Sequence, residues 1–378
     1  VKIDMQRVFV NEPKLDGNER KYLNQCIASR WISFEGPFVK RFEEGMAQLT
    51  NRKYGISVSN GSVALDTAVM ALNLGQDDEV IMPTFTIISC AAAVVRAGAK
   101  PVLVDADPYT WNMKVEDIEA KITEKTKAIM VVHIYGLPVD MDAILALAKK
   151  YNLYVIEDAA EMHGQIYKGN PCGSFGDIST FSFYPNKHIT CGEGGMLVTN
   201  NAQLAERCKL IRNLFFQRGK RYVHEELGYN FRMTNLQAAV GCAQLERIQE
   251  TVEKKRYIGR LYNNLLKGFE EIQLPLEKVE YAENIYWVYG IVLSDSVKED
   301  ADFIMRRLDE EGVGTRGFFW CMHEQPVFQK MKLFKNEVYP NAERLARRGF
   351  YLPSGVTLTD KQQMYVVEKL KKVLTEVR

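Results

Sequence analysis

One lysine stands where its amine could act as a nucleophile. Lys187 lies within residues 181–195, between an apolar segment and the glycine-rich run Gly192-Glu-Gly-Gly195. A lysine held half-buried in such a turn has an accessible neutral amine, which can form a Schiff base with an aldehyde. Most loop lysines are surface residues, so this interpretation depends on residues found elsewhere in the chain.

An acidic residue ends one of the most apolar predicted strands. The strand at residues 153–157 reads Leu-Tyr-Val-Ile-Glu, and Asp158 follows at its carboxyl end, where open α/β sheets bind ligands. A carboxylate in this position needs a cationic partner or has a raised pKa. A protonated pyridine nitrogen would be such a partner, and a salt bridge to a nearby arginine or lysine is the alternative.

A possible phosphate-binding turn and an aromatic side chain add to these candidates. Gly61 and Ser62 follow Asn60 and open an apolar, alanine-rich helix predicted over residues 63–74. The free N–H groups of a helix N-terminus, a serine hydroxyl and a glycine that allows close approach can bind phosphate. An ordinary capped helix has the same pattern. Phe85, just beyond another strand end, could stack on a flat ring or pack in the core.

Strands and helices alternate through the first two thirds of the chain. This order predicts an α/β fold with a mostly parallel central sheet that is covered on both faces. Strands are expected at residues 54–59, 79–82, 101–105, 128–133, 153–157, 179–184 and 195–199, and helices at residues 15–28, 37–49, 63–74, 89–97, 115–121, 141–150, 202–212 and 235–250. The last two strands flank the lysine turn, which therefore resembles a hairpin more than a nucleotide-binding loop.

A charged helix over residues 251–267 is predicted to lead into a second domain. The strands expected near residues 286–293 and 318, and the helices at residues 301–312, 341–348 and 360–377, form an α+β pattern. A chain of 378 residues is also too long for one typical core. We therefore expect a large domain at residues 1–250, with an N-terminal helical arm, and a smaller C-terminal domain at residues 251–378.

Composition and charge favour a globular protein of a reducing compartment. Hydrophobic residues make up 46% of the chain and charged residues 26%, and the net charge of +1 disfavours nucleic acid as a partner. No apolar run is long enough to span a membrane, and the N-terminus has no secretion signal. Seven scattered cysteines without a CxxC pair predict free thiols, and the five histidines form no zinc pattern, so no metal is expected. The expected location is the cytoplasm.

Taken together, the ordered motifs resemble one family, the sugar aminotransferases of the DegT/DnrJ/EryC1/StrS type. The resemblance covers nearly the whole chain. It implies the aspartate-aminotransferase-like fold called PLP fold type I, with pyridoxal 5′-phosphate (PLP) as cofactor and pyridoxamine phosphate (PMP) between the half-reactions. The motifs that carry it are the Gly61-Ser62 turn, Asp158, the segment Ser182-Phe-x-x-x-Lys187 and residues 228–235.

The resemblance also implies a role for each residue of the cofactor site. Lys187 would hold PLP as a Schiff base and act as base and then acid, and Asp158 would pair with the pyridinium nitrogen. Phe85 and Ala160 would cover the two faces of the ring. Glu161 would lie near the ring 3-oxygen, where many relatives have glutamine. The implied phosphate ligands are Gly61, Ser62, Ser182 and, from the neighbouring subunit, Asn230.

The implied reaction moves an amino group from L-glutamate to a nucleotide-linked 4-keto-6-deoxysugar, in a homodimer with composite active sites. Residues 31–33, 186–187 and 228–235 are most similar to the GDP-perosamine synthases, which indicates GDP-4-keto-6-deoxymannose and O-antigen biosynthesis. The motifs are also compatible with UDP or dTDP sugars and with amination at C3. The candidate contacts to sugar and diphosphate are Trp31, Ser33, His188, Arg232 and His323. Interface packing for Trp31, an ion pair for Arg232 and structural roles for the histidines are the alternatives.

Two other functions share part of this pattern. The residues around Lys187 also resemble PLP- or PMP-dependent nucleotide-sugar 3-dehydratases, in which histidine replaces the Schiff-base lysine. Here that position is Lys187, with His188 beside it, so amino transfer is favoured. A non-catalytic regulatory protein of the same fold is the third hypothesis, and the presence of both Lys187 and Asp158 disfavours it.

Overall fold

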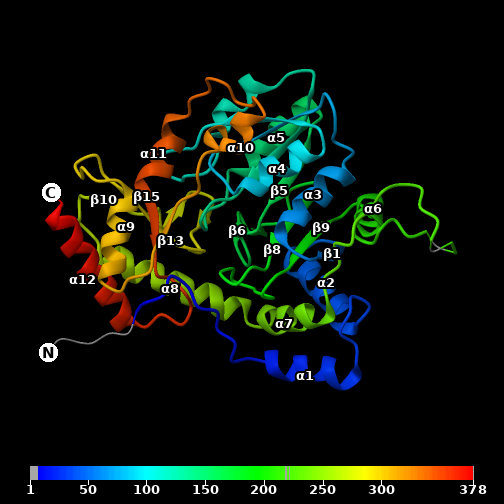
Figure 1. The fold of residues 1–378 in the computed structure, drawn as a ribbon, viewed down its shortest axis with the longest axis horizontal. Helices are drawn as coiled ribbons and strands as arrows, with labels where there is room; N and C mark the ends of the chain where they lie inside the picture. The colour runs from blue at the N-terminus through cyan, green and yellow to red at the C-terminus, as the bar shows by residue number, and fades with distance from the viewer. Residues whose placement is uncertain (1–6, 218, 221, 378) are drawn as a thin grey trace.

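The computed structural model describes residues 7–217, 219–220 and 222–377, and its centre is a seven-stranded sheet (Figure 1). The strand order is β1 (Tyr54–Val58), β9 (Gly195–Thr199), β8 (Ile178–Ser182), β5 (Tyr154–Asp158), β4 (Thr126–Val132), β2 (Glu79–Pro83) and β3 (Lys100–Val104). From β8 to β3 all neighbours are parallel, and β9 runs antiparallel to β8 and to β1. The predicted mostly parallel α/β sheet is confirmed.

Helices cover both faces of this sheet (Figure 1). One face carries α3 (Gly61–Ala71), α4 (Ile88–Arg96) and α6 (Ala202–Arg212). The other carries α2 (Pro37–Leu49), α5 (Met141–Tyr151) and α7 (Asn235–Leu245), with α1 (Glu19–Ser29) packed against α7. Strands β2 and β9 are buried along their whole length, as continuous apolar strands between two helical layers should be.

The C-terminal part forms a second, antiparallel sheet with its own core. Its order is β10 (Ile272–Gln273), β13 (Tyr289–Leu293), β15 (Gly349–Leu352) and β14 (Arg316–Gly317). The helices around it are α8 (Ile248–Leu265), α9 (Ala301–Glu310), α11 (Pro340–Arg348) and α12 (Asp360–Glu376). The segment near the N-terminus also packs here, where the Gly314 N–H donates to the Val8 carbonyl at 2.8 Å.

Several short elements lie between the longer ones. They are η1 (Val115–Asp117), η2 (Glu119–Lys121), η3 (Met322–Glu324), α10 (Pro326–Lys330), β6 (Ile166–Tyr167), β7 (Asn170–Pro171), β11 (Lys278–Val279) and β12 (Ala282–Glu283). Among the described helices, none has both the length and the apolar character that crossing a membrane takes.

Three predicted helix boundaries are wrong. The helix expected over residues 115–121 is two short 3-10 turns, which bury Ile118 between them. The first helix begins at Glu19 and not near Asp16, because the Glu19 carboxylate accepts the Gly17 N–H at 2.8 Å and so fixes the chain outside the helix. The break between α7 and α8 falls before Ile248, which packs in the core of the large sheet.

The division into two domains after residue 250 stays a prediction.

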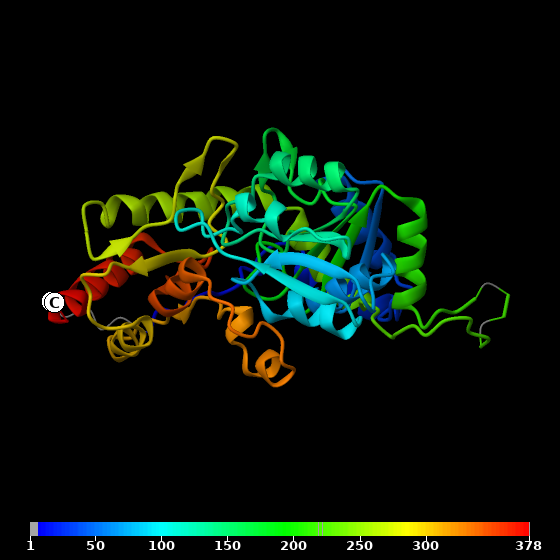
Figure 2. The same cartoon turned by 90° about the horizontal axis from the view of Figure 1, so that it is seen from above.

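The segment between α6 and α7 extends away from the body of the molecule (Figures 1 and 2). Its base is held by backbone bonds, from the Tyr229 N–H to the Ile211 carbonyl at 2.8 Å and from the Leu214 N–H to the Tyr229 carbonyl at 3.0 Å. We call the described residues from 213 to 230 the arm. The arm carries exposed apolar side chains, of which Leu227 is 92% exposed.

Candidate active site

Lys187 lies in the turn that joins β8 to β9, as the sequence predicts. Inside the turn the Lys187 N–H donates to the Tyr184 carbonyl at 2.9 Å, and the Phe183 N–H donates to the Gly194 carbonyl at 2.8 Å. From the C-terminal part, the Trp287 indole N–H donates to the Asn186 carbonyl at 2.9 Å. The turn is therefore fixed from both sheets, and the Lys187 side chain is only 10% exposed.

The Lys187 side chain lines a cavity of about 770 Å³ between the two sheets. Asp158 at the end of β5 and Ser182 at the end of β8 reach it from the large sheet, at the carboxyl edge where α/β sheets bind ligands. Its wall also includes the first residues of α3, and Trp287, Arg316 and Tyr351 from the C-terminal part. We call this space the Lys187 cavity.

Asp158 is a buried carboxylate, 3% exposed, that faces this cavity. Its Oδ1 accepts from the Ala160 N–H at 3.1 Å and from the Thr180 hydroxyl at 3.4 Å, and its Oδ2 accepts from the Cys90 thiol at 3.3 Å. Burial raises its pKa. Among the described residues no cation forms an ion pair with it, so the structural salt bridge considered from the sequence is not present.

Lys187 and Glu161 face each other in the cavity. Lys187 Nζ lies 3.7 Å from Glu161 Oε1 and 3.6 Å from the centre of the Trp287 ring. Glu161 Oε2 accepts the Tyr135 N–H at 2.7 Å. Burial lowers the pKa of Lys187 and raises that of Glu161 to about 8, because desolvation disfavours the charged form of each group. The two shifts bring the proton affinities of the amine and the carboxyl group closer together.

The start of α3 forms one end of the cavity. Gly61 packs so closely on β8 that a Cβ there would lie 2.6 Å from the Cβ of Ser182. The side chain of Asn60 caps the helix by accepting the Val63 N–H at 3.0 Å. Ser62 Oγ lies 2.7 Å from Ser89 Oγ at the start of α4, so two helix N-termini and two hydroxyls meet at this point. Such an arrangement suits a phosphate.

Phe85 does not line the cavity, which corrects the expected ring contact. It is fully buried and packs against the rings of Tyr135, Phe318 and Phe319, so the core-packing alternative holds. Ile87 lines the cavity instead and is 43% exposed. Ala160 lines the cavity as expected.

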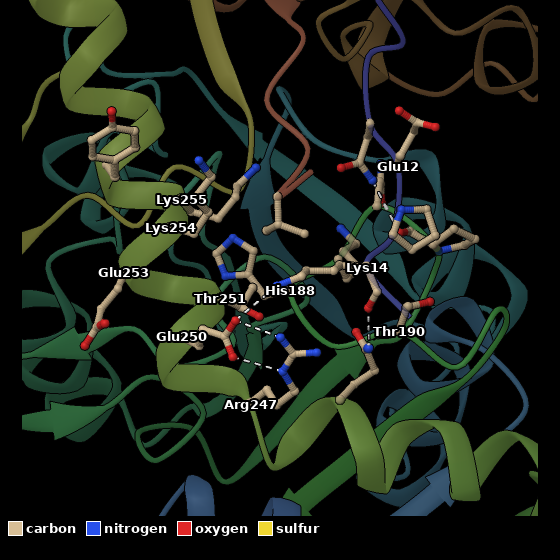
Figure 3. Close-up of a pocket in the computed structure, with 18 residues that line it drawn as sticks. Glu12, Lys14, His188, Thr190, Arg247, Glu250, Thr251, Glu253, Lys254 and Lys255 are labelled. Atoms are coloured by element: carbon tan, nitrogen blue, oxygen red, sulfur yellow. Dashed lines mark hydrogen bonds and ion pairs between the residues drawn. The ribbon is translucent and has the colours of Figure 1, made fainter. Parts of the chain in front are cut away.

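The two candidate histidines also lie away from the Lys187 cavity. His188 is buried and lines a second cavity of about 410 Å³, between α8 and residues 11–14 (Figure 3). Burial beside Lys255 lowers its pKa to about 3, so it stays neutral. His323 is buried between Thr84, whose Oγ1 lies 2.8 Å from Nδ1, and Glu343, whose Oε1 lies 3.1 Å from Nε2. Neither histidine lines the Lys187 cavity.

Four other predicted contacts lie on the outside of the same chain. Trp31 and Ser33 are exposed, and the Trp31 carbonyl accepts from the Asn235 amide at 2.7 Å. Arg232 forms no ion pair among the described residues. Its guanidinium donates to Asn213 Oδ1 at 2.8 Å and lies over the Phe34 ring. Asn230 is exposed at the base of the arm. These residues do not line the Lys187 cavity of their own chain.

The cavity contains residues that the sequence did not reveal. Ser89 could have been suspected from its place at the start of a helix that follows a strand. Trp287, Arg316 and Tyr351 carried no such signal, because only the packing of the second sheet brings them to the cavity. Arg316 forms no ion pair among the described residues, whereas Arg96, also on the cavity wall, is bound to Asp66 at 2.5 Å.

The chain is similar to known proteins over nearly its whole length. The model of the DegT/DnrJ/EryC1/StrS aminotransferase family matches residues 13–371. The chain is 41% identical over 372 residues to a GDP-perosamine synthase from Escherichia coli O157:H7, covering 98% of this chain and 100% of that protein. It is 40% identical over 365 residues to a GDP-perosamine synthase from Vibrio cholerae, covering 96% and 98% of the two chains.

The fold is also found among solved structures. The X-ray structure of an aminotransferase from Psychrobacter cryohalolentis superposes with a TM-score of 0.91 at 31% sequence identity. The match covers 98% of this chain and 99% of that one, so both sheets and the connecting helices are shared.

Proposed function

The chain belongs to the DegT/DnrJ/EryC1/StrS family of PLP-dependent sugar aminotransferases, and we propose that it transfers the amino group of L-glutamate to a nucleotide-linked 4-keto-6-deoxysugar. The observation that carries the proposal is the meeting of Lys187, Asp158 and Glu161 in one cavity. The similarity to GDP-perosamine synthases supports GDP-4-keto-6-deoxymannose as the acceptor and O-antigen polysaccharide as the pathway.

The residues of the cavity fit PLP. Asp158 is a buried carboxylate that forms no ion pair among the described residues, which suits a pyridinium N–H. The contact of Gly61 with Ser182 leaves the α3 N-terminus open to a phosphate, beside the Ser62 hydroxyl. When bound, PLP supplies an electron sink that makes the hydrogen on the substrate carbon acidic.

Lys187 is the group that would accept and return that proton. Burial lowers the pKa of its amine, which increases the neutral fraction that can act as a base. Glu161, 3.7 Å away and with a pKa raised to about 8, can hold a proton while Lys187 is neutral. Together the two side chains keep one exchangeable proton at the reacting centre and away from bulk water.

Arg316 is the proposed contact for the carboxylate of the amino donor. It lines the Lys187 cavity from β14, and a guanidinium can bind both oxygens of a carboxylate. Arg96 is less suited, because Asp66 already occupies its guanidinium with bonds of 2.5 and 3.0 Å.

We place the contacts to the nucleotide, and the contact of Asn230 to the cofactor phosphate, in a second copy of the chain. Trp31, Ser33, Asn230 and Arg232 lie outside the cavity of their own subunit, on a surface that also exposes Ile32 and the apolar residues of the arm. A homodimer would bury this apolar surface and bring these side chains to the partner's cavity. The active site would then be composite.

We also place the enzyme in the cytoplasm. All seven cysteines are free and buried, which suits a compartment that keeps thiols reduced.

The reaction is tested by product analysis. The holoenzyme is incubated with L-glutamate and with GDP-, UDP- and dTDP-linked 4-keto-6-deoxysugars, and the products are identified by mass spectrometry. We expect an aminosugar and an equal amount of 2-oxoglutarate, fastest with the GDP sugar. The variant Lys187→Ala should give no product and no Schiff-base absorbance. A 3-deoxysugar formed without loss of glutamate nitrogen, or full turnover by Lys187→Ala, would reject the proposal.

A further inference from the structure

A buried thiol of α4 contacts the carboxylate of Asp158. Cys90, in the first turn of α4, has no exposed surface, and its Sγ lies 3.3 Å from Asp158 Oδ2. The Thr86 Oγ1 lies 3.6 Å from the same sulfur. Burial and the nearby Asp158 raise the pKa of the thiol well above its usual value, so it keeps its proton. The S–H then donates to Oδ2, which leaves the Thr86 hydroxyl to donate to the sulfur.

The two oxygens of Asp158 are held differently. Oδ1 accepts from a backbone N–H and from the Thr180 hydroxyl, whereas among the described residues Oδ2 accepts from the thiol alone. A thiol is a weak donor, so it fixes the direction of Oδ2 while removing little of its negative charge. Asp158 is 97% buried, faces the cavity and forms no ion pair among the described residues, which points to a cationic ligand.

We propose that Cys90 is a positioning residue for the ring nitrogen of PLP, which orients Oδ2 of Asp158 and leaves its charge for the pyridinium N–H. The proposal rests on the proposed cofactor site. It adds that the strength of the hydrogen-bond donor at position 90 determines the basicity of the Asp158 carboxylate. A hydroxyl there would donate more strongly and make the carboxylate less basic, so the ring nitrogen would lose its proton more readily. A methyl group would leave Oδ2 without a donor.

The test compares the wild-type holoenzyme with Cys90→Ser and Cys90→Ala, and with Cys208→Ser as a matched control. Cys208 is equally buried but lies in α6, on none of the walls of the Lys187 cavity. Each protein is reconstituted with PLP labelled with ¹⁵N in the ring. The ring ¹⁵N chemical shift reports protonation of the nitrogen, and an absorbance titration gives the dissociation constant of PLP.

We expect Cys90→Ala to weaken PLP binding by about 3- to 10-fold, the scale of one ordinary hydrogen bond, because a thiol is a weak donor even to a carboxylate. Cys90→Ser should shift the ¹⁵N signal toward the neutral ring, and Cys208→Ser should change neither quantity. If both Cys90 variants keep the wild-type ¹⁵N shift and PLP affinity and differ only in melting temperature, Cys90 is a packing residue and the proposal fails. Wild-type protein that binds no PLP is a separate result, which would reject the cofactor site itself.

Discussion

At the scale of single residues, desolvation controls the chemistry of the Lys187 cavity. It is the largest cause of the pKa shifts of Lys187, Asp158 and Glu161, and it outweighs the attraction between Lys187 and the two carboxylates. The pKa values of the two acids are raised and that of the lysine is lowered, so the proton affinities of the three groups approach one another. A set of groups adjusted in this way can exchange a proton at little cost, which is what transfer of an amino group between two carbon atoms requires.

The buried Glu161 should make the stability of the apoprotein depend on pH. Its pKa is about 8 in the folded protein against 4.5 when it is exposed, so the folded protein binds more protons between these values and loses stability as the pH rises through this window. Glu161→Gln removes the titrating group. As the pH rises, the free energy of unfolding of the variant should increase relative to that of the wild type, by at most about 5 kcal/mol. This gain is reduced by any stabilisation that Lys187 loses when its carboxylate partner is replaced.

The measurement is the difference in melting temperature between Glu161→Gln and wild type at about pH 5 and about pH 9. Glu253→Gln is the control, because Glu253 is exposed on α8 and its replacement should change the melting temperature little at either pH (Figure 3). An equal difference at both pH values for Glu161→Gln would show that the carboxylate is not held neutral by burial.

At the scale of elements, α3 reaches the cavity only because its first residue has no side chain. The Gly61 backbone touches Ser182 on β8, and four more buried residues of the helix are alanine or threonine. We therefore expect Gly61→Ala to push α3 away from β8, or to displace Ser182, at a cost of about 1–3 kcal/mol for overpacking.

PLP affinity is the sharper readout of Gly61→Ala, because the displaced α3 N-terminus would bind phosphate less well. Titration of the apoprotein with PLP should show a weakening of at least about 10-fold, the equivalent of about 1.4 kcal/mol. Gly75→Ala is the matched control, since the nearest heavy atom to its new Cβ would lie 3.6 Å away. A Gly61→Ala protein that binds PLP as tightly as Gly75→Ala would contradict the proposed place of the phosphate.

The elements near the lysine could be predicted because their signals are local. The apolar strands β8 and β9, and the glycine-rich turn between them, follow from residues 178–199 alone. The place of Phe85 could not be predicted in this way. The chain bends between β2 and α4, so the alternation of side chains along a strand no longer indicates which of them faces the cavity. The position of His323 could not be predicted for another reason. Its partner Thr84 is 239 residues away in the sequence, and no local pattern encodes such a contact.

At the scale of the whole molecule, residues of both sheets form the Lys187 cavity. Lys187, Asp158 and Ser182 come from the large sheet, and Arg316 and Tyr351 close one side from the small one. Three of the residues predicted to bind the acceptor, Trp31, Ser33 and Arg232, lie outside this cavity, near the base of the arm and after α1 (Figure 1). The sequence alone could not place these residues relative to a cavity, because in the proposed homodimer their distance from it depends on how the second subunit docks.

Complementation between two inactive subunits tests the composite site directly. In the proposed dimer each site takes Lys187 from one subunit and Asn230 from the other, so Lys187→Ala and Asn230→Asp remove different halves. Asn230→Asp places a negative charge where a phosphate is expected, which should repel it. In a mixed dimer one site has both intact halves and the other has neither. After unfolding and refolding together in equal amounts, the pair should recover about one quarter of wild-type activity, because about half of randomly assorted dimers are mixed and each carries one good site. Each variant refolded alone sets the baseline, and a mixture that stays at this baseline while forming mixed dimers would place Asn230 in the same subunit's site or outside the site altogether.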